Sequence, residues 1–267
     1  MQKDSMFSIK DFSKLTGIKE TSLRYYDELG LFVPAVRSAS GYRYYSPFQL
    51  ISINSIKLLQ DLDIPIKEIS KIERSRTPDS MLRLLTKKSA ELSSQLSELE
   101  ATFAVVRTLR RMISIGLYLK SEEIDVKYLE ELPLTMGPRN TFDADADFYA
   151  AFIAYCEHAQ ESGTDLRLPI GGYWDSWNNF VERPNQPTRF FSIDPNGNQI
   201  RSSGCYLTGY THGYYGETGD LTERMSKHMA DNDLTVRGGV YCAYLLDEIS
   251  LQNPDDYLLQ VSAELVI

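Results

Sequence analysis

The chain has 267 residues, of which 42% are hydrophobic and 24% charged, and its formal net charge is −9. This length exceeds that of a typical single domain, and the composition excludes disordered and collagen-like proteins. No apolar run approaches the roughly 20 residues that cross a bilayer. The N-terminal sequence lacks the apolar core of a signal peptide, so we expect a cytoplasmic protein without a membrane partner.

Charge is distributed unevenly along the chain. Residues 1–120 hold 19 Lys and Arg against 13 Asp and Glu, whereas the remaining residues hold 9 against 24. The overall acidity therefore does not exclude a nucleic-acid partner for the first part of the chain. A basic N-terminal part and a strongly acidic C-terminal part indicate two regions with different partners.

The first region, residues 1–76, is predicted to contain short helices with clear start and stop signals. Ser8 and Gly17 are placed as caps of one helix, and a second helix covers about residues 20–29. Gly41 suits the turn of a following hairpin, and two further helices open at prolines. This order predicts a winged helix–turn–helix domain.

Residues 77–117 are predicted to form one long helix that joins two copies of the chain. The segment contains no Gly or Pro between its first turn and about residue 115, and apolar residues recur every seven positions. Such a sustained heptad repeat is typical of a coiled coil. A long amphipathic helix that packs on its own domain is the alternative. The repeating positions are Leu85, Leu92, Leu99, Val106 and Ile113.

Residues 118–267 change in character and contain several strand-like segments. Helical stretches near 145–162 and 217–231 interrupt these segments. The order strand–helix–strand–strand occurs about twice, although no repeat is visible at the level of single residues. We therefore expect an α+β domain with internal pseudo-twofold symmetry.

The tripeptide Arg-Tyr-Tyr occurs twice, beginning at Arg24 and at Arg43. The first copy lies on the helix that would enter the major groove of DNA, and the second lies on the hairpin. Arginine offers a planar donor to guanine edges or to phosphate, so the two arginines are the stronger candidates for DNA contacts. The second tyrosine of each copy, Tyr26 and Tyr45, is predicted to belong to the core.

The first 75 residues are similar to the N-terminal domain of the MerR family of transcription regulators. The resemblance rests on the pieces RYYDELGL and GYRYY at their separation in this chain. It implies a homodimer with an antiparallel coiled coil, which binds palindromic promoter DNA. When an inducer binds, the dimer would distort that DNA and realign the promoter elements for RNA polymerase. By position, the resemblance implies DNA contacts from Arg24, Tyr25, Tyr42, Arg43 and Lys67. Lys19 stands where relatives often have a capping Ser or Thr, and it is a candidate for a phosphate contact.

The acidic region is expected to sense a small molecule rather than a metal. No Cys or His follows the long helix, the three histidines are isolated, and the three cysteines are widely spaced, so we expect neither a metal site nor a cofactor. The region resembles the GyrI-like effector-binding domain of BmrR-type multidrug-sensing activators. That resemblance implies a buried glutamate at position 242, where this chain has Cys242. Glu264 is the alternative acid.

The density of aromatic residues in this region predicts a cavity for an aromatic or cationic hydrophobic inducer. An ordinary aromatic core is the alternative for each single ring. The candidate ligand-binding residues are Tyr149, Trp174, Tyr206, Tyr241, Cys242, Tyr257 and Glu264.

The sequence is compatible with three functions. The first is a ligand-responsive transcription activator. The second is an enzyme, because some GyrI-like domains resemble hydrolases of small electrophiles, but the sequence shows no nucleophile–base constellation and we expect no catalysis. The third is a DNA-binding repressor that needs no ligand.

Overall fold

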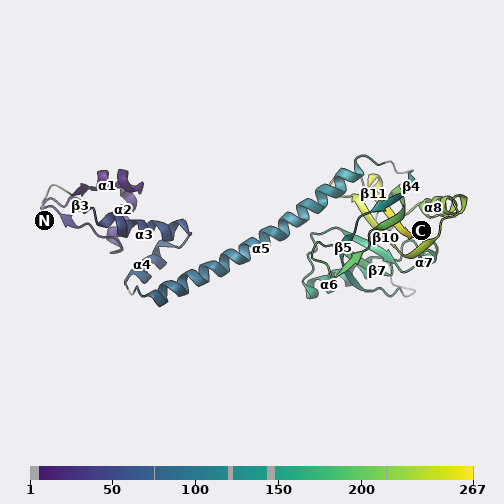
Figure 1. The fold of residues 1–267 in the computed structure, drawn as a ribbon, viewed down its shortest axis with the longest axis horizontal. Helices are drawn as coiled ribbons and strands as arrows, with labels where there is room; N and C mark the ends of the chain where they lie inside the picture. Colours follow the sequence, from purple (N-terminus) through teal and green to yellow (C-terminus); the bar gives the residue numbers. More distant parts are fainter. Residues whose placement is uncertain (1–5, 75, 120–122, 143–147, 215, 267) are drawn as a thin grey trace. The chain divides into compact units, whose positions relative to one another are not determined.

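The computed structural model describes residues 6–74, 76–119, 123–142, 148–214 and 216–266 (Figure 1). Its contacts divide the chain into two compact units, Met1–Glu98 and Leu99–Ile267. The combination of helices and sheets confirms the predicted α+β class. Among the described residues, no helix is both long and apolar enough to cross a membrane.

The first unit contains short helices, a small antiparallel sheet and the beginning of a long helix. The sheet has the strand order β1-β3-β2. The elements are β1 (Phe7–Ser8), α1 (Ile9–Thr16), α2 (Glu20–Glu28), β2 (Val36–Arg37), β3 (Arg43–Tyr45), α3 (Gln49–Asp61), α4 (Ile66–Arg74) and α5 (Pro78–Gly116).

Local capping explains where these helices begin and end. The Ser8 side chain accepts a hydrogen bond from the Asp11 amide at the start of α1, and Gly17 ends this helix with a φ of 72°. Lys19 precedes α2 and provides no side-chain cap. Gly41, with a φ of 81°, lies in the turn between β2 and β3, as the sequence predicts.

The core of the first unit is built around stacked aromatic rings. The rings of Phe12 and Tyr45 stack with centroids 4.6 Å apart, and Phe32 stacks on Tyr45 at 5.7 Å. Tyr26 is buried as well, and its hydroxyl donates to Gln60 Oε1 at 2.7 Å. The second tyrosine of each Arg-Tyr-Tyr stretch therefore belongs to this core, which fixes α2 and the hairpin against α1 and α3.

The second unit is an antiparallel sheet with helices packed on it. Its helices are α6 (Phe148–Ser162), α7 (Trp177–Glu182) and α8 (Leu221–Asp231), together with a 3-10 turn at Pro254–Asp256. Its strands are β4 (Ile124–Leu129), β5 (Leu132–Arg139), β6 (Ile170–Trp174), β7 (Arg189–Ile193), β8 (Gln199–Arg201), β9 (Gly204–His212), β10 (Val236–Leu246) and β11 (Leu258–Leu265).

The strand order shows the predicted pseudo-twofold arrangement. The described strands form one sheet in the order β4-β9-β11-β10-β6-β7-β5-β8. The halves β5-α6-β6-β7 and β9-α8-β10-β11 therefore have matching connections, and they meet where β6 pairs antiparallel with β10. We call this pairing the central seam.

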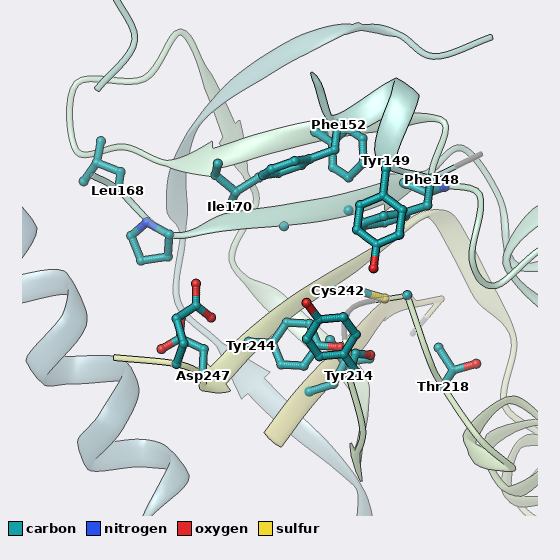
Figure 2. A pocket seen from close by; sticks show the side chains of 18 of the residues that line it. Phe148, Tyr149, Phe152, Leu168, Ile170, Tyr214, Thr218, Cys242, Tyr244 and Asp247 are labelled. Atoms are coloured by element: carbon teal, nitrogen blue, oxygen red, sulfur yellow. The ribbon is translucent and has the colours of Figure 1, made fainter. Parts of the chain in front are cut away.

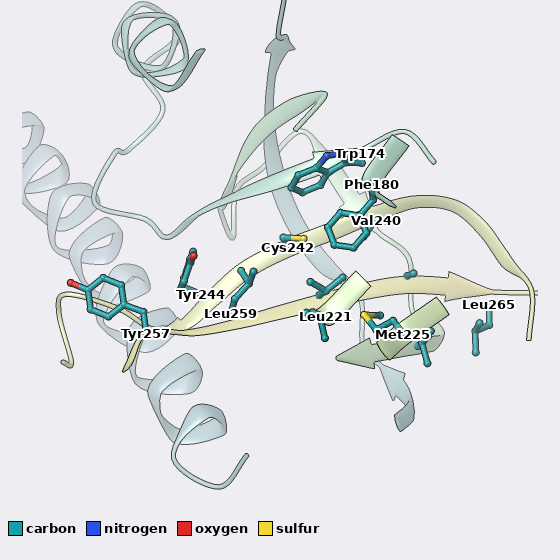
Figure 3. Packing of buried hydrophobic residues seen from close by; sticks show 13 residues of the cluster. Trp174, Phe180, Leu221, Met225, Val240, Cys242, Tyr244, Tyr257, Leu259 and Leu265 are labelled. Atoms are coloured by element: carbon teal, nitrogen blue, oxygen red, sulfur yellow. The ribbon is translucent and has the colours of Figure 1, made fainter. Parts of the chain in front are cut away.

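Glycines let both helices approach the same face of the sheet. A Cβ on Gly137 of β5 would lie 2.6 Å from the ring of Tyr155 in α6. A Cβ on Gly209 of β9 would lie 2.7 Å from the sulfur of Met225 in α8. Figure 3 shows the apolar cluster on the α8 half, where Met225, Leu221 and Leu259 pack beside Cys242. The two helices flank the central seam, and α7 packs on the seam beside α8 through Phe180, which contacts Trp174.

We predict that Gly171→Ala destabilises the second unit. Its Cβ would lie 2.4 Å from the carbonyl oxygen of Cys242 and 2.4 Å from the ring of Phe191. Overpacking of this kind costs about 1–3 kcal/mol. Chemical denaturation of the full chain measures the loss. Gly204→Ala is the control, because its nearest neighbour would be 3.9 Å away. Equal stability of both variants would contradict the tight seam.

Candidate DNA-binding and ligand sites

The helix α2 presents Arg24 and Tyr25 to solvent. The Arg24 side chain is 50% exposed and lies 3.6 Å from Glu20, one turn earlier in the helix. Tyr25 is 40% exposed, whereas Leu23 and Tyr26 face the core. An exposed arginine and tyrosine on the second helix of a helix–turn–helix occupy the positions from which base edges and phosphates are contacted.

A buried aspartate connects α2 to the hairpin. The Asp27 side chain is only 2% exposed, and both its oxygens accept hydrogen bonds from Nη2 of Arg37, at 2.7 and 2.6 Å. The Nε of Arg43 donates to Asp27 Oδ2 at 2.6 Å, and this hydrogen bond raises the pKa of the Arg43 guanidinium. Two arginines of the hairpin thus share one carboxylate of α2, which holds the hairpin in a defined position.

The other predicted DNA-binding residues lie on the surface of the first unit. Tyr42 is exposed in the hairpin turn, and Lys67 is exposed at the start of α4. Lys19 is exposed immediately before α2. Arg43 is more enclosed than Arg24, with a side chain 19% exposed. Sequence reasoning did not identify Arg37, since the hairpin pattern alone gives no sign of its ion pair with Asp27.

A cavity of about 460 Å³ lies on the sheet face that carries α6, and we call it the α6 cavity (Figure 2). Aromatic and aliphatic side chains dominate its walls. Phe148, Tyr149 and Phe152 come from α6, Cys242 and Tyr244 from β10, and Tyr214 and Thr218 from the segment before α8. The cavity therefore lies beside the central seam, between the two halves of the second unit.

Three of the seven predicted ligand-binding residues, Tyr149, Trp174 and Cys242, line this cavity. Tyr241 lines a different cavity on the opposite sheet face. Tyr206, Tyr257 and Glu264 line neither of the two cavities. The seven residues therefore do not form one site. Strand geometry gives the reason, because neighbours such as Tyr241 and Cys242 point to opposite faces.

Glu264 is engaged by Arg237, with which it forms an ion pair. In the sheet it lies opposite Tyr206 of β9 rather than beside Cys242. Alternation along β11 directs Ala263 toward the cluster that contains Cys242, and it directs Glu264 to the other face. The structure therefore does not place Glu264 where a cation in the α6 cavity could contact it.

Two other acids line the α6 cavity, Asp247 and Glu248. Asp247 is half-buried, and burial raises the pKa of its carboxyl group. Its Oδ1 accepts a hydrogen bond from the Ile249 amide at 3.1 Å. Figure 2 shows Asp247 at the end of the cavity away from Tyr149. The sequence analysis did not select either acid. Both directly follow the last apolar residues of the strand, in the segment LLDE, and this position at a strand end was the one sign that they could border a cavity.

The thiol of Cys242 is suited to packing rather than to chemistry. It is buried, and burial raises its pKa well above the ordinary value. Burial raises the pKa of the neighbouring Tyr244 as well, whose hydroxyl donates to the carbonyl of Tyr214 at 2.7 Å. A protonated thiol is a poor nucleophile at neutral pH. Across the described residues, His, Cys, Asp and Glu form no group that could hold a metal ion.

Residues 7–76 match the family described as "MerR HTH family regulatory protein". The Multidrug-efflux transporter 2 regulator of Bacillus subtilis (strain 168) is 28% identical over 249 residues, which cover 91% of this chain and 90% of that protein. The Multidrug-efflux transporter 1 regulator of the same organism is 29% identical over 159 residues, or 57% of each chain. A solved structure of an EcmrR–DNA complex in EcmrR-RPo aligns with 97% of this chain and 99% of that chain, at 16% identity and a TM-score of 0.39.

The matched domain coincides with the capped helices and the hairpin of the first unit, and the first relative above extends over both units. Residues 7–76 therefore form a MerR HTH domain.

Proposed function

We propose that this protein is a ligand-responsive transcription regulator that binds promoter DNA as a homodimer and responds to a hydrophobic aromatic or cationic molecule. The observation that carries the DNA-binding part is the exposed pair Arg24 and Tyr25 on α2, beside a hairpin held by Asp27. The similarity to two regulators of multidrug-efflux transporters supports the ligand-sensing part. Action with RNA polymerase at the promoter belongs to the same proposal.

Dimerisation through α5 is proposed from the side chains that this helix exposes. Leu92, Leu96, Leu99 and Phe103 are all solvent-exposed in the single chain. They follow the spacing of a heptad repeat, so they lie on one stripe of the helix. An exposed apolar stripe of this length is unfavourable in water, and a second copy of the same helix would cover it. In this proposal, residues 1–76 bind DNA, residues 77–117 join the two copies, and residues 118–267 bind the ligand.

The α6 cavity is the proposed ligand site. Its volume of about 460 Å³ and its aromatic walls suit a drug-sized apolar molecule. Tyr149, Trp174 and Cys242 remain proposed contacts, and Asp247 replaces Glu264 as the proposed partner of a positive charge. Hydrolysis is less well supported, because the buried thiol of Cys242 has a raised pKa and the cavity lining in the described residues offers it no histidine as a base.

Arg24→Ala is expected to weaken specific DNA binding by about 1–3 kcal/mol, the usual value of a base-edge contact. The DNA is a palindrome selected by the native protein from a random library, and fluorescence anisotropy measures its affinity. Arg83→Ala in α5 is the control. Arg83 is also an exposed arginine that pairs with an acid one turn earlier in its helix, so this variant loses the same charge and should bind DNA like the native protein. If Arg24→Ala binds this DNA as tightly as the native protein does, α2 is not the helix that contacts the base edges.

The double variant Leu92→Asp with Leu99→Asp should be monomeric. The dimer would then bury four carboxylates in the interface between its two α5 helices. Burial of a charge without a partner is unfavourable. Sedimentation at micromolar concentration measures the mass. The pair Ser93→Asp with Ser94→Asp adds the same charge beside the heptad positions and should stay dimeric. A dimeric leucine variant would show that another surface joins the copies.

Asp247→Asn should reduce the affinity for tetraphenylphosphonium about tenfold, which corresponds to ~1.4 kcal/mol. Affinity for the neutral triphenylphosphine oxide should not change, nor should either affinity in the control Asp231→Asn. Because burial raises the pKa of Asp247, the carboxyl group gains a proton as the pH falls through that raised pKa. Cation binding to the native protein should weaken in the same range. Calorimetric titration measures these affinities. If Asp247→Asn and the native protein bind the cation equally well, Asp247 does not contact the ligand.

A further inference from the structure

A second cavity, of about 650 Å³, lies on the sheet face opposite the α6 cavity. Its walls come from the last turns of α5, including Met112 and Ile115, and from the strands below them. Phe191, Tyr210 and Tyr241 contribute aromatic surface. All of these residues belong to the second unit. We call this space the α5 cavity.

The α5 cavity is lined by cationic side chains, although the region that contains it is strongly acidic. Arg107 and Arg111 project from α5, Lys127 from β4 and Arg201 from β8. Lys127 is already engaged, since its Nζ lies 3.2 Å from Glu123 and 5.1 Å from the centre of the Tyr210 ring. One acid, the exposed Glu130, is part of the described lining. Positive charge therefore prevails in this cavity.

Arg201 is buried, and it forms no ion pair with the residues that the structure describes. The residue is only 9% exposed, and its Nη2 donates to the backbone carbonyl of Glu130 at 2.9 Å. Its guanidinium carbon lies 5.1 Å from the centre of the Tyr206 ring. Its Nε is buried and has no hydrogen-bond partner among the described residues. The Nε donor of a residue that lines the cavity is thus left unused.

The surroundings make this arginine unfavourable as it stands. Burial lowers the pKa of the Arg201 guanidinium, and the nearby positive charge of Arg111 lowers it further. The described groups that act on it are Tyr206, Tyr241 and Arg111, none of which is a carboxylate. A buried cation is normally paired, and an unmade hydrogen bond to a charged group costs more than one to a neutral group. An anionic ligand would supply the missing partner.

We propose that the α5 cavity binds an amphiphilic carboxylate, with its apolar body against the rings and α5 and its carboxylate on Arg201. A carboxylate matches the donor geometry of a guanidinium better than a point anion does. Arg111 and Arg107 attract the same charge from the cavity wall on α5. The α6 cavity is lined instead by Asp247, Glu248 and Arg167, and Arg167 is paired with Asp165, so the two cavities favour ligands of opposite charge.

The test uses the fluorescence of pyrenebutyrate and of its neutral counterpart pyrenebutanol, titrated with the full-length native protein. Both probes carry the same apolar body, so their difference reports the anionic contact. We expect pyrenebutyrate to bind about tenfold more tightly, which is ~1.4 kcal/mol. This preference should disappear in Arg201→Met and decrease in Arg111→Gln. Arg139→Gln is the control, because Arg139 is exposed, pairs with Asp175 and lies outside the cavity lining.

Each outcome decides the proposal. Equal affinity for the two probes, or an unchanged preference in a folded Arg201→Met, would overturn it. If circular dichroism shows that Arg201→Met is unfolded, the preference of Arg111→Gln decides in its place. Displacement of pyrenebutyrate by tetraphenylphosphonium, or loss of its binding in Tyr149→Ala, would assign the probe to the α6 cavity and would also overturn the proposal. Failure of the α6 cavity to bind cations leaves this test unaffected.

Discussion

The central seam, where β6 pairs with β10, is the constraint on which the second unit depends. Gly172 lies opposite Cys242 across this seam, and Gly171 lies opposite Ala243. With no side chain at either glycine, the ring of Trp174 approaches one face of the seam and the ring of Phe191 approaches the other. The two halves of the sheet can then join continuously, while their helices stay apart. The rings of Trp174 and Phe191 thus cover the seam directly, and each of them lies in or beside one of the two cavities.

The same sheet separates two chemical environments. Alternation along β10 sends Cys242 and Tyr244 toward the α6 cavity and sends Tyr241 toward the α5 cavity. The cavity on one face is lined by two acids of the loop after β10. The cavity on the other face is lined by arginines of α5 and β8. The net acidity of the region therefore says little about either cavity, because local charges at short distance outweigh distant ones that salt screens. The α5 cavity has the further property that its wall is the long helix itself.

The sequence predicted the features that local interactions determine. The caps at Ser8 and Gly17, the hairpin turn at Gly41 and the helix from Pro78 follow from neighbouring residues alone, and the structure has each of them. The sequence alone could not show which candidate ligand residues share one cavity, because which face of a strand borders a cavity depends on register and on the packing of distant helices. Tyr206, Tyr257 and Glu264 were chosen for residue type, and only the fold shows that they lie elsewhere. Arg201 had no sequence signal, since its burial arises from β5, β8 and β9 together.

The two arginines of the Arg-Tyr-Tyr stretches differ in a way that the repeated tripeptide conceals. Arg24 has an exposed partner on its own helix, so its guanidinium can exchange Glu20 for a phosphate or a base at little cost. Arg43 is bound to the buried Asp27, and moving it would leave a buried carboxylate with one arginine fewer. Arg37 shares that carboxylate and is 51% exposed. We therefore propose that the hairpin presents Arg37 and Tyr42 to DNA while Arg43 stays on Asp27 and positions the hairpin.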